Sequence, residues 1–380
     1  MSLTLQRTSD IEPVTFKQGN GVWLLDKKGR LYLDALNGQG ANALGHSHQN
    51  IVEVITQQAT KLIHTFSYRT EKQEALAEKL KELSGMEEAL LVNSANDANV
   101  LALKLLSLYA EKNGIIHPRV VVIKSGLGTQ TSELKILQEN FNHCAVNKVE
   151  LISSDMQDIE NIIKASQVMA IMLNPLDVEW LTEPENGLLK LQALCNKHKL
   201  LFILDETECG LGRTGKWFTF QFENCHPDIL TLSKPLAGGL PLGACLSNHK
   251  MRGLLQPQPH DYLFTASPLV CSLALTFVKT VKQYNLLANV TEQGKQLLAE
   301  LQTRLSDNRQ VNAIHSKGLW LEINFTKEIP GLIELGLKHG LLFDVVSERL
   351  IRLWPPYIIT AEEVKELVNR LVAVIAESLL

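Results

Sequence analysis

The sequence predicts an α/β protein with a large domain around a mostly parallel sheet and a smaller α+β domain. Between residues 89 and 232 the chain carries short apolar runs separated by helical patterns: ALLV, VVVI, VELI, VMAIML, LLFIL and ILTL. Strands that are apolar on both faces and alternate with helices are typical of a parallel sheet covered on both sides. Shorter strands and helices follow in the C-terminal third, and this change of pattern indicates the second domain.

Local patterns predict the remaining elements in chain order. Residues 22–35 predict two strands around a Lys-Lys-Gly turn. One long helix is expected from Pro268 to about Ser306, and the last helix from Thr360, where Thr360-x-x-Glu363 has the form of a capping box. The other expected elements are helices at 50–64, 71–84, 100–110 and 329–339 and strands at 319–325 and 348–353.

We divide the chain of 380 residues into three segments. Residues 1–49 are expected to pack with the small domain. Residues 50–260 form the large α/β domain, and residues 261–380 supply an interdomain helix and the small α+β domain.

Composition excludes several classes of function. The net charge of −4 and a balance of 37 basic and 41 acidic residues argue against a nucleic-acid surface. No apolar run approaches the roughly 18 residues of a membrane span, and the N-terminus, MSLTLQRTSDIEP, has no apolar core typical of a secretory signal. We therefore expect a cytoplasmic protein that binds neither membranes nor nucleic acid.

Cysteine and histidine usage predicts no metal site. None of the cysteines form a C-x-x-C pair, so buried thiols are expected rather than disulfides or zinc: Cys144, Cys195, Cys209, Cys225, Cys245 and Cys271. His46 and His48 lack a carboxylate or cysteine close in sequence, which favours a structural loop over a metal.

Charged residues follow two of the apolar runs. LLFIL leads directly into Asp205, and ILTL leads into Ser233 and Lys234. In open α/β sheets, ligands bind beyond the carboxyl ends of the strands. A partly buried ion pair is one explanation of these two charges. The other is a pyridoxal phosphate site, which needs a lysine amine, a carboxylate for the pyridine nitrogen and an anchor for the phosphate.

The stretch LLVNSANDAN, residues 90–99, offers that anchor. It reads as a strand end, a polar loop and the start of a helix, and a helix N-terminus attracts anions. The loop carries no glycine, so it can hold a phosphate only if its backbone does not need a positive φ at Ala95.

The segment LDETECGLGRTGKWFTFQFENCHPDILTLSKPLAGGLPLGA, residues 204–244, closely resembles the cofactor-lysine region of the class III, fold-type-I aminotransferases. The acetylornithine and ornithine aminotransferase group is the most similar. Further resemblance lies in ALGHSH (43–48), ATKLIHTFSYRTEKQEALAEKL (59–80), LLANVTEQGKQLLAEL (286–301) and RLWPPYIITAEEV (352–364). The resemblance implies a pyridoxal-phosphate-dependent transferase fold of type I and a homodimer whose two chains share the sites.

The resemblance also implies roles for individual residues. Lys234 takes the position of the lysine that binds the cofactor and moves protons, and Asp205 that of the pyridine-nitrogen partner. Arg352 matches an arginine that binds a substrate carboxylate, and Glu179 a glutamate that pairs with this arginine and moves away for one substrate. Ser94 begins the phosphate loop. The other implied cofactor-binding positions are Ala95, Asn96, Leu127, Thr207, Glu208 and Leu263.

Several of these positions depart from the family pattern. An aromatic ring that stacks on the cofactor is replaced by Leu127, and a threonine that reaches the partner's phosphate by Leu263. An arginine for a substrate carboxylate is replaced by Gln130, whose neutral amide cannot replace a bidentate guanidinium. Glu208 stands where a glutamine is usual and is either solvated or close to the cofactor ring. We therefore expect weakened cofactor affinity.

These observations favour a pyridoxal-phosphate-dependent aminotransferase. It would move an amino group between an amino acid or amine, acetylornithine-like or another ω-amine, and 2-oxoglutarate, with arginine biosynthesis as the associated pathway. Two alternatives stay open: a weakened or inactive homologue that acts as a binding or regulatory subunit, and another reaction of the same cofactor, such as racemisation.

Overall fold

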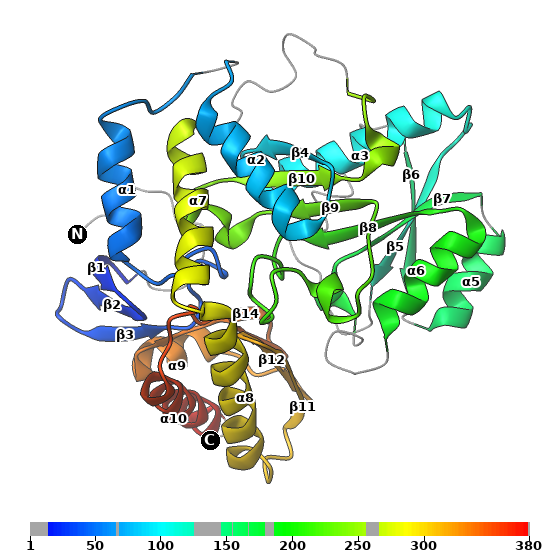
Figure 1. Cartoon of the computed structure of the whole chain (residues 1–380). Helices are drawn as coiled ribbons and strands as arrows, with labels where there is room; N and C mark the ends of the chain where they lie inside the picture. Colours follow the sequence, from blue (N-terminus) through cyan, green and yellow to red (C-terminus); the bar gives the residue numbers. More distant parts are fainter. Residues whose placement is uncertain are drawn as a thin grey trace, which may run out of the picture.

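The computed structural model describes residues 14–65, 68–124, 146–153, 155–165, 167–178, 186–255 and 266–378. Within these residues three sheets form, with strand orders β4-β10-β9-β8-β7-β5-β6, β1-β2-β3-β13 and β11-β12-β15-β14. In Figure 1 the seven-stranded sheet fills the upper right, and the two smaller sheets lie at the left and below.

The strands of the large sheet are β4 (Glu88–Val92), β5 (Arg119–Lys124), β6 (Asn147–Ile152), β7 (Val168–Leu173), β8 (Leu201–Glu206), β9 (Ile229–Leu232) and β10 (Gly243–Ser247). Strands β9, β8, β7, β5 and β6 pair in parallel, whereas β10 is antiparallel to both β9 and β4. The predicted mostly parallel sheet is therefore confirmed. The sequence prediction missed β10, because GACLS is short, consists mostly of small residues and follows a glycine- and proline-rich turn.

Alternating side chains of the parallel strands enter two separate cores. Val120 and Val122 of β5 pack in a cluster with the apolar face of α3 (Ala95–Lys112). Val121 and Ile123 belong to the other cluster, which includes residues of helices on the opposite face. Both faces of the sheet are thus covered, as the runs of consecutive apolar residues predicted. The other helices of this region are α1 (Gln49–Ala59), α2 (Glu71–Ser84), α5 (Met156–Ala165) and α6 (Gly187–His198).

The N-terminal strands β1 (Phe16–Asn20), β2 (Trp23–Asp26) and β3 (Leu31–Asp34) form an antiparallel sheet, and the predicted Lys-Lys-Gly turn joins β2 and β3. Strand β13 (Leu341–Leu342) pairs in parallel with β3, so this sheet joins the two ends of the chain. The polar sequence of β1, FKQGN, gave no strand signal.

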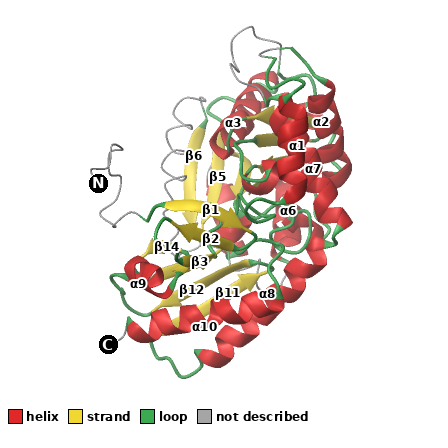
Figure 2. Ribbon diagram, turned by 90° about the vertical axis from the view of Figure 1, so that its left-hand side faces the viewer, coloured by secondary structure: helices red, strands yellow, loops and turns green. Residues whose placement is uncertain are grey.

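The C-terminal sheet contains β11 (Val311–Lys317), β12 (Trp320–Phe325), β15 (Leu350–Leu353) and β14 (Asp344–Ser347), all antiparallel to their neighbours. Helices α8 (Leu286–Arg304) and α10 (Ala361–Glu377) lie side by side below this sheet, with α9 (Leu332–His339) beside α10 (Figure 2). Thr360 caps α10, and both hydrogen bonds of the predicted capping box with Glu363 are present.

Three predicted helix boundaries are wrong. Helix α1 ends at Ala59 rather than at residue 64. The long helix from Pro268 is two helices, α7 (Pro268–Gln283) and α8, because Asn285 adopts a left-handed backbone with φ of 50° that ends the helical path. Helix α3 begins at Ala95 rather than near residue 100, because the Ser94 side chain accepts the Asp97 backbone N–H and fixes the N-cap there.

Candidate functional site

The two charged strand ends meet at one edge of the large sheet. Asp205 is the penultimate residue of β8, and Lys234 follows β9 after one residue, at the start of a short 3₁₀ helix (Lys234–Ala237). Strands β8 and β9 are parallel neighbours, and Asp205 pairs in register with Thr231. The Lys234 backbone N–H donates to the Thr207 carbonyl at 3.0 Å, which holds the two chain segments together. We call the carboxyl ends of β8 and β9 and the start of α3 the cofactor edge.

Asp205 is held by neutral hydrogen-bond donors. Its carboxylate accepts from Asn99 Nδ2 at 2.8 Å, from Thr207 N at 3.1 Å and Thr207 Oγ1 at 2.6 Å, and from Thr231 Oγ1 at 3.2 Å. Burial raises the pKa of Asp205, because these hydrogen bonds only partly replace lost hydration. Such a carboxylate is suited to bind a cationic ring nitrogen. Asn99 and Thr231 were not assigned a role from sequence, although Asn99 ends the polar stretch that suggested an anion site.

Lys234 contacts a different carboxylate. Its Nζ donates to Glu208 Oε1, and Nζ also lies 5.2 Å from the centroid of the Trp354 ring. The Glu208 side chain is 6% exposed, so the suggestion of a solvated Glu208 is wrong. Among the contacts that the structure describes for Lys234, none is an ion pair with Asp205, the simple explanation of the two strand ends; the described carboxylate partner is Glu208.

The start of α3 lies close to this edge because it packs against strand β10 at Gly243. Ser94 precedes the helix with an extended backbone, and Ala95 is already helical, so no positive φ is needed at this position. A β-carbon at Gly243 of β10 would clash with the Ser94 carbonyl oxygen, so glycine there permits the close approach. The first-turn N–H groups of a helix lack intrahelical acceptors and favour an anion.

Arg352 lies on β15 in the C-terminal sheet and is 2% exposed. Its Nε and Nη2 donate to Glu322 Oε1 at 2.7 and 2.5 Å, and the guanidinium lies 5.6 Å from the centroid of the Trp354 ring. Burial lowers the pKa of Arg352, but the nearby carboxylates of Glu322 and Glu208 outweigh this and raise it. Sequence reasoning missed Glu322; a charged residue inside the apolar strand WLEINF was the available signal.

The segment after Arg352 is fixed by a buried arginine. Arg213 donates to the carbonyls of Leu319 at 3.0 Å, Pro355 at 2.5 Å and Gly40 at 3.3 Å. Its guanidinium lies 5.8 Å from the centroid of the Trp354 ring. These bonds hold Trp354 in place, and Trp354 faces both Lys234 and Arg352.

Four predicted site residues lie outside the described part of the chain: Leu127, Gln130, Glu179 and Leu263. Their contacts are therefore not described. His46 and His48 have structural partners: His46 Nε2 lies 2.8 Å from Asp34 Oδ2, and the His48 ring accepts the Asn50 backbone N–H at the start of α1.

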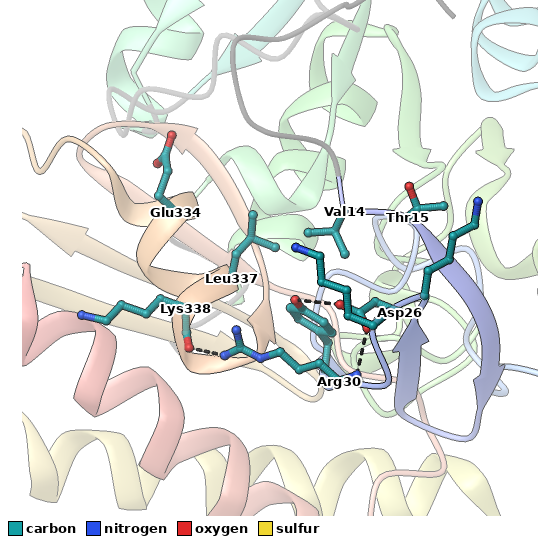
Figure 3. A pocket seen from close by; sticks show the side chains of 10 residues that line it. Val14, Thr15, Asp26, Arg30, Glu334, Leu337 and Lys338 are labelled. Carbon is teal, nitrogen blue, oxygen red and sulfur yellow. Dashed lines mark hydrogen bonds between the residues drawn. The ribbon is translucent and has the colours of Figure 1, made fainter. Parts of the chain in front are cut away.

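A cavity of about 600 Å³ lies apart from these residues, between the β2–β3 turn and α9 (Figure 3). Exposed Lys27, Lys28 and Arg30 line it, and the Arg30 guanidinium donates to the Lys338 carbonyl. Asp26 is occupied by the backbone N–H groups of Lys28 and Arg30, each at 2.8 Å. The cavity shares none of its lining residues with the cofactor edge.

Among the described helices, none is both long and apolar enough to cross a membrane.

Comparisons with known proteins identify the family of the chain. The family model "Aminotransferase class-III" matches residues 4–126 and 121–375. The chain is 36% identical to acetylornithine aminotransferase 1 of Bordetella bronchiseptica over 97% of this chain and 96% of the relative. It is 30% identical to acetylornithine aminotransferase of Methanocaldococcus jannaschii, over 96% and 94%.

Solved structures show the same fold. The acetylornithine aminotransferase of Elizabethkingia anophelis superimposes with a TM-score of 0.85 at 26% identity, covering 98% of this chain and 96% of that one. The ornithine δ-aminotransferase of Plasmodium falciparum gives 0.87 at 25% identity, covering 98% and 95%. The chain therefore belongs to the pyridoxal-phosphate-dependent class III aminotransferases, within the acetylornithine and ornithine aminotransferase group.

Proposed function

We propose that the protein is an active aminotransferase that binds pyridoxal phosphate and passes an amino group from an amino acid or ω-amine to 2-oxoglutarate. The observation that carries this proposal is the cofactor edge, where a lysine amine, a buried carboxylate and a helix N-terminus converge. A structural role alone does not require this combination, because a buried carboxylate held only by neutral donors raises the free energy of the protein without a ligand.

The residues present fit the cofactor. Lys234 would hold its aldehyde carbon, and the desolvated carboxylate of Asp205 would bind its protonated ring nitrogen. Ser94 and the backbone N–H groups of Ala95 and Asn96 would receive the phosphate at the start of α3. Leu127, Thr207, Glu208 and Leu263 are the further proposed contacts. When bound, the cofactor draws electrons from the carbon that carries the amino group.

The side chain of Lys234 supplies proton transfer. Its Nζ must be deprotonated to act as nucleophile or base, and the hydrogen bond that Nζ donates to Glu208 has to be given up for that step. Asp205 stays in position because Asn99 and Thr207 hold its two oxygens.

The substrates are proposed as a small-molecule amino donor and a 2-oxo acid. Arg352 is the proposed contact for a substrate carboxylate, with Glu179 and Gln130 as further substrate-binding positions. Because Gln130 has no charge to bind the carboxylate of acetylornithine, an amine donor that does not need a carboxylate contact at this position is favoured over acetylornithine. We propose a cytoplasmic homodimer; exposed Val52, Ile55, Leu62 and Ile63, in α1 and the segment after it, offer apolar surface for a partner.

Amino transfer itself tests this proposal. The protein is incubated with pyridoxal phosphate, 2-oxoglutarate labelled with ¹³C, and single amines or amino acids, and labelled glutamate is measured by mass spectrometry. We expect labelled glutamate with at least one donor and none with Lys234→Ala. Bound cofactor without labelled glutamate from any donor would instead support the weakened or regulatory homologue. Racemised amino acid without labelled glutamate would support racemisation.

A further inference from the structure

One buried arginine connects three parts of the chain that are distant in sequence. Arg213 is 0% exposed, and its guanidinium donates to three backbone carbonyls: Gly40 at 3.3 Å, Leu319 at 3.0 Å and Pro355 at 2.5 Å. These carbonyls belong to the segment after β3, the turn between β11 and β12, and the segment after β15. Because a buried cation is costly unless its donors have acceptors, Arg213 holds these three segments to the loop after β8.

The same guanidinium packs on two aromatic rings. Its Cζ atom lies 4.7 Å from the centroid of the Tyr357 ring and 5.8 Å from that of Trp354. The Trp354 side chain is fully buried, and its backbone N–H donates to the Ala35 carbonyl at 2.7 Å. A β-carbon at Gly40 would lie only 3.2 Å from Cε3 of the indole and 3.3 Å from Nη2 of Arg213. The indole is therefore closely packed and has little room to shift while Arg213 is in place.

Trp354 also contacts the two side chains on which the proposed reaction depends. Lys234 Nζ lies 5.2 Å and Arg352 Cζ 5.6 Å from the centroid of its ring. A substrate with a carboxylate must reach from the reacting carbon at Lys234 to Arg352, whereas an amine without a carboxylate needs only Lys234. The position of the indole therefore matters most for substrates that have to span this distance.

We infer that Arg213 is a positioning residue, which through Trp354 sets the spacing between Lys234 and Arg352 and thereby the affinity for carboxylate-bearing substrates. The proposed acceptor, 2-oxoglutarate, is such a substrate. A displacement of about 1 Å in a reaction site can lower the rate about a hundredfold. The inference rests on the proposed function, because it takes Arg352 as the contact for a substrate carboxylate.

Arg213→Lys tests the inference, because it keeps the charge and removes the planar group that reaches several carbonyls. Glutarate, an unreactive dicarboxylate, is titrated calorimetrically into cofactor-loaded protein. The constants kcat and KM, per attached cofactor, are measured with glutamate and with 1-aminobutane. We expect the Kd of glutarate and the KM of glutamate each to rise about tenfold, while kcat for glutamate and kcat/KM for 1-aminobutane change less than about threefold. A purely structural role would lower the yield of folded protein and leave these constants unchanged.

Arg370→Lys is the matched control. The Arg370 guanidinium also donates to a backbone carbonyl, that of Gly340 at 2.6 Å, and lies 5.2 Å from the centroid of another indole ring, that of Trp23. None of these three residues is proposed to contact cofactor or substrate. This variant should leave glutarate binding and both kinetic constants for glutamate unchanged, and an equal loss in Arg213→Lys and Arg370→Lys would contradict the inference.

Trp354→Leu tests whether Arg213 acts through the indole. It should weaken glutarate binding in the same way, and adding Arg213→Lys to it should weaken binding by less than about twofold further, because the two changes remove one shared interaction. Arg213→Gln, whose neutral amide still donates to a carbonyl, replaces Arg213→Lys if that variant does not fold.

Three results would overturn the inference: unchanged glutarate affinity in the folded Arg213 variants, no glutarate binding by the native protein, or additive losses in the double variant. If glutarate binding falls as expected but no donor yields labelled glutamate, the proposed function fails, whereas the role of Arg213 in placing Arg352 stands.

Discussion

The cofactor edge and the buried pair of Arg352 with Glu322 stabilise their charged side chains in opposite ways. Asp205 receives hydrogen bonds from the neutral groups of Asn99, Thr207 and Thr231, and burial raises its pKa. Arg352, in contrast, has Glu322 within ion-pair distance and Asp344 beside it in register. A bound cation would therefore stabilise the carboxylate of Asp205, whereas the charge of Arg352 is already neutralised by a carboxylate of the protein. Burial alone does not identify a ligand site; the charge of the nearest partners does.

Removing the amine of the cofactor edge should have the largest effect. Lys234→Ala leaves no nucleophile for the cofactor and no base close to the reacting carbon, so we expect amino transfer to fall about 10⁴-fold or more. The coupled glutamate assay measures this loss. A matched variant, Lys250→Ala, removes a lysine that forms an ion pair with Asp228, just before β9 and at the opposite end of this strand from Lys234, and should retain activity. Retained activity in Lys234→Ala would contradict its assignment.

Replacing Arg352 alone should lower the free energy of unfolding more than replacing both Arg352 and its partner Glu322. Arg352→Met leaves Glu322 buried without its partner, which should lower the free energy of unfolding by about 3–5 kcal/mol. The double variant Arg352→Met, Glu322→Leu should recover most of this loss, because two apolar side chains replace the whole pair. Urea unfolding of cofactor-free protein measures both. Equal losses in the single and double variants would show that the pair does not act as a unit.

Restoring two expected cofactor contacts should tighten cofactor binding. Leu127→Phe would add a stacking ring, worth about 0.5–1.5 kcal/mol, and Leu263→Thr a hydroxyl donor to phosphate, worth about 1.5–3 kcal/mol. Together they correspond to a gain of roughly tens to a thousandfold in affinity. Titration of cofactor-free protein by absorbance measures it. Nanomolar affinity in the unaltered protein would show that these two leucines cost nothing.

A carboxylate next to the cofactor edge should make stability depend on pH. Burial raises the pKa of Glu206 from 4.5 to about 7, although Thr219 donates to it. The folded protein then binds a proton more tightly than the unfolded chain, so stability should fall as pH rises from 4.5 to about 7 and change no further above that. The fall is at most about 3.5 kcal/mol, at about 1.4 kcal/mol per pKa unit.

Glu206→Gln is the control for this pH dependence, because it accepts the Thr219 N–H without titrating. The difference in unfolding free energy between the two proteins, measured at pH 5 and pH 8, isolates Glu206 from Asp205, whose raised pKa acts in the same direction. A difference that is the same at both pH values would contradict the prediction.

Placing a glycine in the proposed phosphate loop, which has none, should have the smallest effect on stability and on cofactor affinity. Ala95 is the first residue of α3 and has a helical backbone, so Ala95→Gly relieves no strain. We expect a loss of no more than about 0.5–1 kcal/mol in stability. Cofactor affinity should stay within about threefold, less than the tenfold that 1.4 kcal/mol represents. A large gain in affinity would show that the phosphate requires a positive φ at this position.

The contrast between the two regions also explains how far the sequence could predict the site. Asp205 and Lys234 were found because each follows an apolar strand, and strand ends of a parallel sheet meet at one edge. The pairing of Lys234 with Glu208 and of Arg352 with Glu322 depends on tertiary register, which no local pattern encodes, although Glu322 stands out as a charged residue inside an apolar strand.

The same distinction holds for the fold. The buried parallel strands were predicted from their apolar runs, and the capping box at Thr360 from its spacing. Strand β10, the break at Asn285 and the early start of α3 were missed, because small or polar residues form them through long-range pairing or a single backbone angle. The proposed division of the chain into domains stays a prediction.

The most direct test of the cofactor edge is the position of the covalent bond to the cofactor. Protein loaded with pyridoxal phosphate is reduced with borohydride, digested and mapped by mass spectrometry, with Asp205→Asn treated in parallel. We predict a single modified peptide with the label on Lys234. Less label is expected in Asp205→Asn, because the ring nitrogen of the cofactor loses its carboxylate partner. Label on another lysine, or none at saturating cofactor, would contradict the assignment of this edge as the cofactor site.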